Sequence, residues 1–227
     1  MSKTSPHYHG HRQRLRERFL NGTESALADY ELLELLLFGA NPRGDVKPTA
    51  KELINTFGSI TNVIYAQPKD LRKIKGMGDA AVAILKAIQQ VSIRSLRSQA
   101  MERPVLSSWD AVLNYCAAQM EHLTIEQLRL IFLDRKNQII CDEVQQTGTI
   151  DYTPIFPREV VKRSLDIGAA AFIMVHNHPS GDPTPSPADI DMTRKIRDVS
   201  ERLGIHLHDH IIIGNGCYTS FKSEGLI

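Results

Sequence analysis

Ala169–Asp189 reads AAAFIMVHNHPSGDPTPSPAD, and this stretch decides the fold of the second half of the chain. Its first seven residues, Ala169–Val175, are apolar. They are too few to cross a membrane and have the right length for a buried strand. His176 and His178 follow directly. Because residues two apart on a strand project from the same face, the sequence predicts two imidazoles side by side at the strand end.

A helix start follows at Ser186-Pro187-Ala188-Asp189, with ten residues between the second histidine and Asp189. His176, His178 and Asp189 offer two nitrogens and one oxygen to a single point. Three protein ligands leave a fourth position open, as in catalytic zinc sites. The alternative is purely structural, because Ser-x-x-Asp with proline at the first helical position is also an ordinary helix start that resembles a capping box.

Three further histidines, His206, His208 and His210, alternate along a strand predicted at 205–213. Alternation predicts that they share one face, where they would compete as metal ligands. No nearby loop supplies a third ligand at comparable spacing. Asp209 and His210 are therefore expected to be structural or to support the ligands.

The motif His-x-His, seven residues, Ser-x-x-Asp resembles the signature of the JAMM (MPN-plus) metalloproteases. The segment HNHPSGDPTPSPAD, with PREVVKRSLDIGAA before it and DHIIIG after it, is similar to the bacterial RadC family. The first half also resembles the RadC amino-terminal region, through HRQRLRERF, YELLELLLFGA and KGMGDAA. The resemblance implies an α/β fold, a mixed-sheet JAMM/MPN-like sandwich preceded by a small all-helical helix-hairpin-helix domain. Alternating strand and helix patterns in the second half agree with it.

The resemblance also implies one Zn²⁺ per chain, held by the two histidines and the aspartate. In JAMM enzymes a glutamate before an earlier strand is the base, and the motif serine supports the tetrahedral intermediate. Carried over, these roles fall on Glu126, which precedes LRLIFLD, and on Ser186. Residues 127–129 are Gln-Leu-Arg, which departs from the family's Glu-x-Cys-Gly, so Glu143 is kept as the alternative base. If neither glutamate reaches the metal, the module binds zinc without peptidase activity.

Composition is that of a soluble globular protein, with 42% hydrophobic and 23% charged residues. The three cysteines are scattered and lack Cys-x-x-Cys spacing, which argues for a reducing compartment and against zinc ligation by cysteine. Neither a signal peptide nor an apolar run of membrane-spanning length is present in the sequence. We therefore expect a cytoplasmic protein with no membrane partner.

Charge divides the chain into two parts. Residues 1–105 hold 16 basic and 10 acidic residues, a net +6, whereas residues 106–227 hold 11 and 16, a net −5. Such asymmetry indicates two modules with different partners. We expect a helical domain at 1–103, a zinc hydrolase domain at 104–227, and a linker in the polar stretch 89–98.

Basic residues near the amino terminus are candidates for DNA contact. Arginines alternate with other residues at positions 12, 14, 16 and 18. They are either a phosphate-contacting arm or a solvated helix start. The next helix, expected at Tyr30–Phe38, should be buried, with Glu31 and Glu34 facing outward.

The segment 71–79 has the pattern of a helix-hairpin-helix. Gly76 and Gly78 allow a tight turn with exposed backbone N–H groups before a helix that begins at Asp79, and Lys73 and Lys75 lie just before the turn. A degenerate copy surrounds residues 57–59. Paired hairpins of this kind in DNA-repair proteins grip the sugar-phosphate backbone without reading sequence. The alternative is a hairpin with a structural role only.

Two functions follow. The first is a zinc-dependent metalloprotease or isopeptidase that acts on a peptide or isopeptide substrate and is recruited to DNA through its basic half. The second is a DNA repair or recombination factor whose JAMM-like module is a nuclease or a non-catalytic scaffold. The intact ligand set favours the first, because a scaffold needs no open coordination site.

Overall fold

The computed structural model describes residues 10–22, 27–148 and 156–227. The chain divides into two compact units, Met1–Ser92 and Ile93–Ile227. The division falls inside the helix α6, Asp79–Met101, which continues through the stretch where the sequence predicted a linker. No glycine or proline interrupts α6, so nothing ends the helix before Pro104. The expected domain boundary near residue 103 stays a prediction.

The first unit is helical, and its leucine-rich core includes Leu33, Leu37, Leu53 and Leu85, all fully buried. Two short hairpins stand out, one between α3 and α4 and one between α5 and α6. Ser59 caps α4 by accepting a hydrogen bond from Asn62 N. The helices before α6 are α1 (His11–Asn21), α2 (Asp29–Ala40), α3 (Lys47–Phe57), α4 (Ile60–Tyr65) and α5 (Pro68–Leu71).

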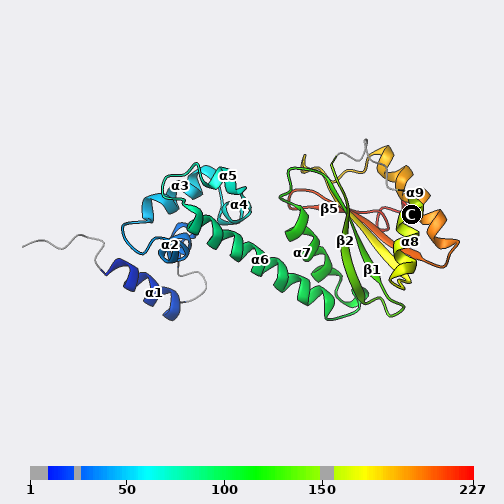
Figure 1. Cartoon of the computed structure of the whole chain (residues 1–227), viewed down its shortest axis with the longest axis horizontal. Coiled ribbons are helices and arrows are strands. Elements are labelled where there is room, and N and C mark those ends of the chain that lie inside the picture. Colours follow the sequence, from blue (N-terminus) through cyan, green and yellow to red (C-terminus); the bar gives the residue numbers. More distant parts are fainter. Residues whose placement is uncertain (1–9, 23–26, 149–155) are drawn as a thin grey trace, which may run out of the picture. The chain divides into compact units, whose positions relative to one another are not determined.

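The second unit is built on a five-stranded mixed sheet in the order β2-β1-β3-β4-β5. Only β3 and β4 are parallel, and the other neighbouring strands are antiparallel. One face is covered by α7, the other by α8 and α9 (Figure 1). This is the α/β sandwich that the sequence predicted. Its elements are η1 (Val105–Ser107), α7 (Trp109–Met120), β1 (Gln127–Leu133), β2 (Ile139–Thr147), α8 (Pro157–Asp166), β3 (Ala171–Asn177), α9 (Pro187–Glu201), β4 (His206–Ile213) and β5 (Tyr218–Ser220).

The strand β3 lies at the centre of the sheet, and all seven of its residues are buried. A strand covered on both faces must be apolar throughout, which explains the unbroken run AFIMV. The crossover from β3 to its parallel neighbour β4 runs through α9, so the end of β3 and the start of α9 lie near each other. The part of the chain that the structure describes contains no helix long and apolar enough to span a bilayer.

Candidate metal centre

Two histidines meet at the end of β3, as alternation predicted. The Nε2 atoms of His176 and His178 are 3.0 Å apart, and their ring centroids are 4.8 Å apart. His176 is fully buried, whereas 18% of the His178 side chain is exposed. One imidazole is thus held inside the sandwich and the other lies at its rim.

Asp189 brings a carboxylate to the same point from the first turn of α9. Its Oδ1 lies 3.5 Å from His176 Nε2, and its Oδ2 lies 3.7 Å from His178 Nε2. The capping box is also formed, because Asp189 N donates to Ser186 Oγ at 3.1 Å and Ser186 N donates to Asp189 Oδ2 at 2.8 Å. The ligand and helix-start interpretations are therefore compatible.

The hydroxyl of Ser186 is engaged with the same carboxylate. Ser186 Oγ donates to Asp189 Oδ2 at 2.6 Å. Burial works against the charge of Asp189, but hydrogen bonds from His178 and Ser186 and the nearby His176 outweigh it, so the pKa of Asp189 is lowered. The carboxylate is ionised at neutral pH and oriented by its cap.

Glu126 approaches from the residue before β1. Its Oε1 lies 3.9 Å from His176 Nε2, and one ligand atom each from Glu126, His176 and His178 lie within 4.8 Å of one another. Glu143 points elsewhere: its carboxylate pairs with Arg163 on α8, and that hydrogen bond lowers its pKa. Of the two glutamates, Glu126 is the one beside the histidines.

The donor set fits a metal ion in its spacing. Four donors about 2.0–2.1 Å from a tetrahedral zinc lie about 3.3–3.4 Å from one another. The two histidine Nε2 atoms are 3.0 Å apart, and Asp189 offers a different oxygen to each, Oδ1 at 3.5 Å from His176 and Oδ2 at 3.7 Å from His178. Glu126 can also supply an oxygen, but at 3.9 Å it is farther from His176 than Asp189 is. Either carboxylate can supply the third donor: Glu126 groups with both histidines within 4.8 Å, whereas Asp189 lies nearer to His176.

The protonation of the two imidazoles also fits a cation. Burial lowers the pKa of His176 to about 4, so this ring is neutral at neutral pH. The Nδ1 atom of His178 lies 2.8 Å from Asp182 O, which can only accept, so Nδ1 carries a proton. The hydrogen bond to Asp189 raises the pKa of His178, and the protonated ring places its second proton on Nε2; in the neutral ring, Nε2 instead has a lone pair that faces His176. Two lone pairs 3.0 Å apart repel unless a metal ion or a proton lies between them.

Asn177, between the two histidines, holds the segment that carries Glu126. Its side chain is 1% exposed. Gln127 N donates to Asn177 Oδ1 at 2.9 Å, and Asn177 Nδ2 donates to Ile125 O at 3.3 Å. These bonds bracket Glu126 on both sides. The sequence interpretation missed this role, although a polar residue in an apolar strand was a signal that it needs partners.

One expectation about β4 was wrong. His206, His208 and His210 do not share a face, because the register with β3 shifts and Phe172 and Ile173 pair with Leu207 and Asp209. The extra residue, His208, packs against Trp109 of α7. His210 instead lies beside His176, on the α9 side of the sheet. A bulge of this kind depends on both strands and leaves little trace in one strand's sequence.

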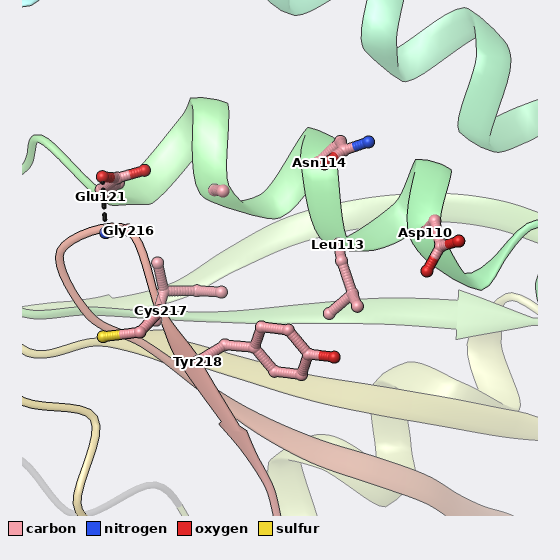
Figure 2. Close-up of a pocket in the computed structure, with 9 residues that line it drawn as sticks. Asp110, Leu113, Asn114, Glu121, Gly216, Cys217 and Tyr218 are labelled. Atoms are coloured by element: carbon pink, nitrogen blue, oxygen red, sulfur yellow. Dashed lines mark hydrogen bonds between the residues drawn. The ribbon is translucent and has the colours of Figure 1, made fainter.

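A cavity of about 570 Å³ lies between α7 and the β4–β5 turn, lined by Asp110, Leu113 and Tyr218 among others (Figure 2). Its lining includes none of the proposed metal ligands. The turn is nevertheless tied to the loop after His178, because Asn215 N donates to Gly181 O at 2.9 Å.

That turn and the loop after His178 pack closely against each other. A Cβ atom on Gly214 would lie 2.4 Å from Gly181 O and 2.8 Å from Pro183 Cδ. No real Cβ contact is that short, so position 214 requires glycine for space rather than for its backbone angle. The loop that follows His178 is thus packed directly against the turn between β4 and β5.

In the first unit, the hairpin lysines differ in their surroundings. Lys73 pairs with Asp70 at 2.6 Å, and both Lys73 and Lys75 are exposed. Gly76 has φ of +91°, and Thr49 Oγ1 donates to Lys75 O at 3.1 Å just beneath the turn. Gly78 directly precedes α6, so this long helix begins only a few residues after the two lysines.

Two of the amino-terminal arginines form hydrogen bonds or ion pairs within the helical unit. Arg12 donates to three backbone carbonyls after α2, those of residues 41, 42 and 44. Arg18 pairs with Glu31. Glu34 was expected to face outward, and that was wrong: it is fully buried and bonds to His11 Nε2 at 2.7 Å. Helix α1 packs over α2 and covers it, which periodicity within α2 alone does not reveal.

Two family models match the chain, one in each half. A family model described as RadC-like JAB domain matches residues 106–226, and one described as UPF0758 N-terminal matches residues 9–83. A UPF0758 protein of Rhodobacter capsulatus is 55% identical over 213 residues, which cover 94% of this chain and all of the relative. A UPF0758 protein of Ruegeria pomeroyi is 52% identical over 217 residues, 96% of this chain and 97% of the relative.

Proposed function

The chain belongs to the UPF0758 family with a RadC-like JAB domain, and we propose that it is a zinc-dependent hydrolase of peptide or isopeptide bonds. One observation carries the proposal. His176 and His178 point their Nε2 atoms at each other across 3.0 Å, with an ionised carboxylate beside both. This arrangement is stable with a cation between the donors, and two imidazoles with one carboxylate suit zinc.

His176, His178 and Asp189 would hold the metal. Bound zinc would supply a water of lowered pKa, about 7, at the open fourth position. Glu126 then acts as the base: its carboxylate accepts a proton from the attacking water and returns it to the leaving amine. Ser186 orients Asp189 through its hydroxyl and supports the developing oxyanion when that hydroxyl turns to the substrate.

The test combines zinc analysis with hydrolysis of a panel of peptide, isopeptide-linked and branched-DNA substrates. His176→Ala should lose zinc and turnover together. Glu126→Gln should keep zinc and lose about 10²–10⁴-fold in turnover, because it keeps its shape and loses only the base. Glu143→Gln is the matched control and should change neither, since Glu143 pairs with Arg163.

Three outcomes would contradict the proposal. If the wild-type protein takes up no zinc at neutral pH, the zinc-dependent hydrolase is refuted. Turnover that survives Glu126→Gln and disappears with Glu143→Gln would show that Glu143 is the base. Cleavage of branched DNA with no cleavage of amide bonds would favour the nuclease alternative.

We also propose that the helical unit contacts the DNA backbone and recruits the hydrolase. The support is the net charge of +6 over residues 1–105 and the exposed Lys73 and Lys75 beside the first turn of α6. Binding to duplex DNA should weaken as salt rises, and a Lys73→Ala/Lys75→Ala variant should lower the salt slope by about 1–2. Arg135→Ala/Lys136→Ala removes the same charge from the second unit and is the control. A salt-independent affinity, or equal effects of both variants, would refute the contact.

We also propose a compartment for the protein, which the scattered cysteines support. All three are free thiols, and burial raises the pKa of Cys116 to about 12, which makes it unreactive. We place the protein in a reducing compartment, the cytoplasm.

A further inference from the structure

Three buried groups extend from the metal centre toward α9. His176 Nδ1 lies 2.8 Å from His210 Nε2, and His210 Nδ1 lies 2.6 Å from Thr193 Oγ1. Thr193 Oγ1 in turn lies 2.5 Å from the backbone oxygen of Asp189. His176, His210 and Thr193 are all fully buried. The chain of contacts therefore starts at one metal donor and ends on the backbone of another.

The position of each proton in this chain of hydrogen bonds follows from its last member, the Asp189 carbonyl, which can only accept a hydrogen bond. The Thr193 hydroxyl therefore donates to it. That leaves the Thr193 oxygen to accept from His210 Nδ1–H. Asp209 accepts from the backbone N of His210 and from Ser220 Oγ rather than from the His210 ring, and burial lowers the pKa of His210 although the Asp189 carboxylate acts in the opposite direction. A fully buried imidazole that makes no ion pair is neutral, so its second nitrogen, Nε2, has a lone pair.

The last step places a proton on His176. Because His210 Nε2 accepts, His176 Nδ1 must donate to it. The lone pair of the neutral His176 ring is then on Nε2, on the side of His178 and Asp189. Metal-binding histidines generally have their other ring N–H held by such an acceptor, which fixes tautomer and orientation.

We propose that His210 is a positioning residue that, through Thr193 and the Asp189 carbonyl, holds His176 in its metal-binding tautomer. The inference rests on the proposed metal centre for its function, but the tautomer itself does not depend on it. It ties the two donors together, because α9 carries both Asp189 and, one turn later, Thr193. Displacement of α9 would loosen a carboxylate ligand and release the tautomer of a histidine ligand at the same time.

The tautomer is measured directly by ¹⁵N NMR of the histidine rings in metal-free wild-type protein. We expect His176 to carry its proton on Nδ1. In Thr193→Val, which keeps the shape of the side chain and removes the hydroxyl, the preference should weaken. A proton on Nε2 of His176 in the wild type would overturn the proposal whether or not zinc binds.

Zinc affinity, measured by competition with a chelator, is the second readout. His210→Phe should weaken zinc binding by about 10–100-fold. His210→Gln should recover most of the loss, because its amide offers an acceptor oxygen and a donor NH2 group. His208→Phe makes the same change on the other face of β4 and should leave both readouts unchanged.

The outcomes separate this inference from the hydrolase proposal. Wild-type protein with the Nδ1–H tautomer that binds no zinc would refute the hydrolase and leave the tautomer assignment standing. Folded His210→Phe with wild-type zinc affinity would overturn the role of His210. If His210→Phe does not fold, Thr193→Val and the wild-type spectrum decide.

Discussion

Replacing Asn177 with alanine tests how the segment of Glu126 is held. The change removes two hydrogen bonds, one of 2.9 Å from Gln127 N and one of 3.3 Å to Ile125 O. The side chain is 1% exposed, so water does not replace it readily. A buried backbone group left without a partner costs about 1–3 kcal/mol, and the longer bond contributes less than the shorter one. We expect Asn177→Ala to lower the free energy of unfolding by about 2–4 kcal/mol.

Urea unfolding measures this loss, and Asn114→Ala is its control. Asn114 is exposed on α7, so its replacement should change stability by no more than about 0.5 kcal/mol. Zinc affinity should change little in Asn177→Ala, because the donors on β3 and α9 remain, whereas turnover should fall as Glu126 loses its position. If Asn177→Ala has the same free energy of unfolding as the control, the two hydrogen bonds of Asn177 do not hold the segment around Glu126, and the prediction is refuted.

The charged Asp142 carboxylate should stabilise the fold at neutral pH but not at strongly acidic pH. Burial opposes its charge, but the hydroxyl of a tyrosine and two arginines outweigh burial and lower its pKa. The stability gap between wild type and Asp142→Asn, measured by urea unfolding, should therefore be full at neutral pH and close as pH falls below about 4; a constant gap would contradict this. Gly76→Ala should lower the melting temperature more than Gly44→Ala, since both have φ near +90° but only at Gly76 would Cβ meet Thr49 Oγ1, at 2.7 Å; equal effects in thermal denaturation would exclude the clash. Arg12→Ala should destabilise the helical unit by about 1–3 kcal/mol in chemical denaturation without altering the salt slope of DNA binding, because Arg12 bonds three backbone carbonyls; a changed slope would show that it contacts phosphate.

Local patterns predicted the parts of the centre that depend on one element. Strand alternation brought His176 and His178 together, and the helix-start pattern placed Asp189 at the first turn of α9. Contacts between distant elements were out of reach. The bulge that turns His210 toward His176 arises from the pairing of β4 with β3, and the burial of Glu34 arises from the packing of α1 on α2. Periodicity within one strand or helix does not report what covers it.

The contact between Gly214 and Gly181 bears on how related sequences should be sorted. A side chain at position 214 would push against the backbone of the loop that places His178, although it lies 36 residues further along the chain. A homologue with both histidines and the aspartate intact, but with a larger residue at this position, would have a displaced ligand loop. A survey that scored only the metal motif would count such a protein as active, so glycine at 214 belongs in the signature by which degenerate members are recognised.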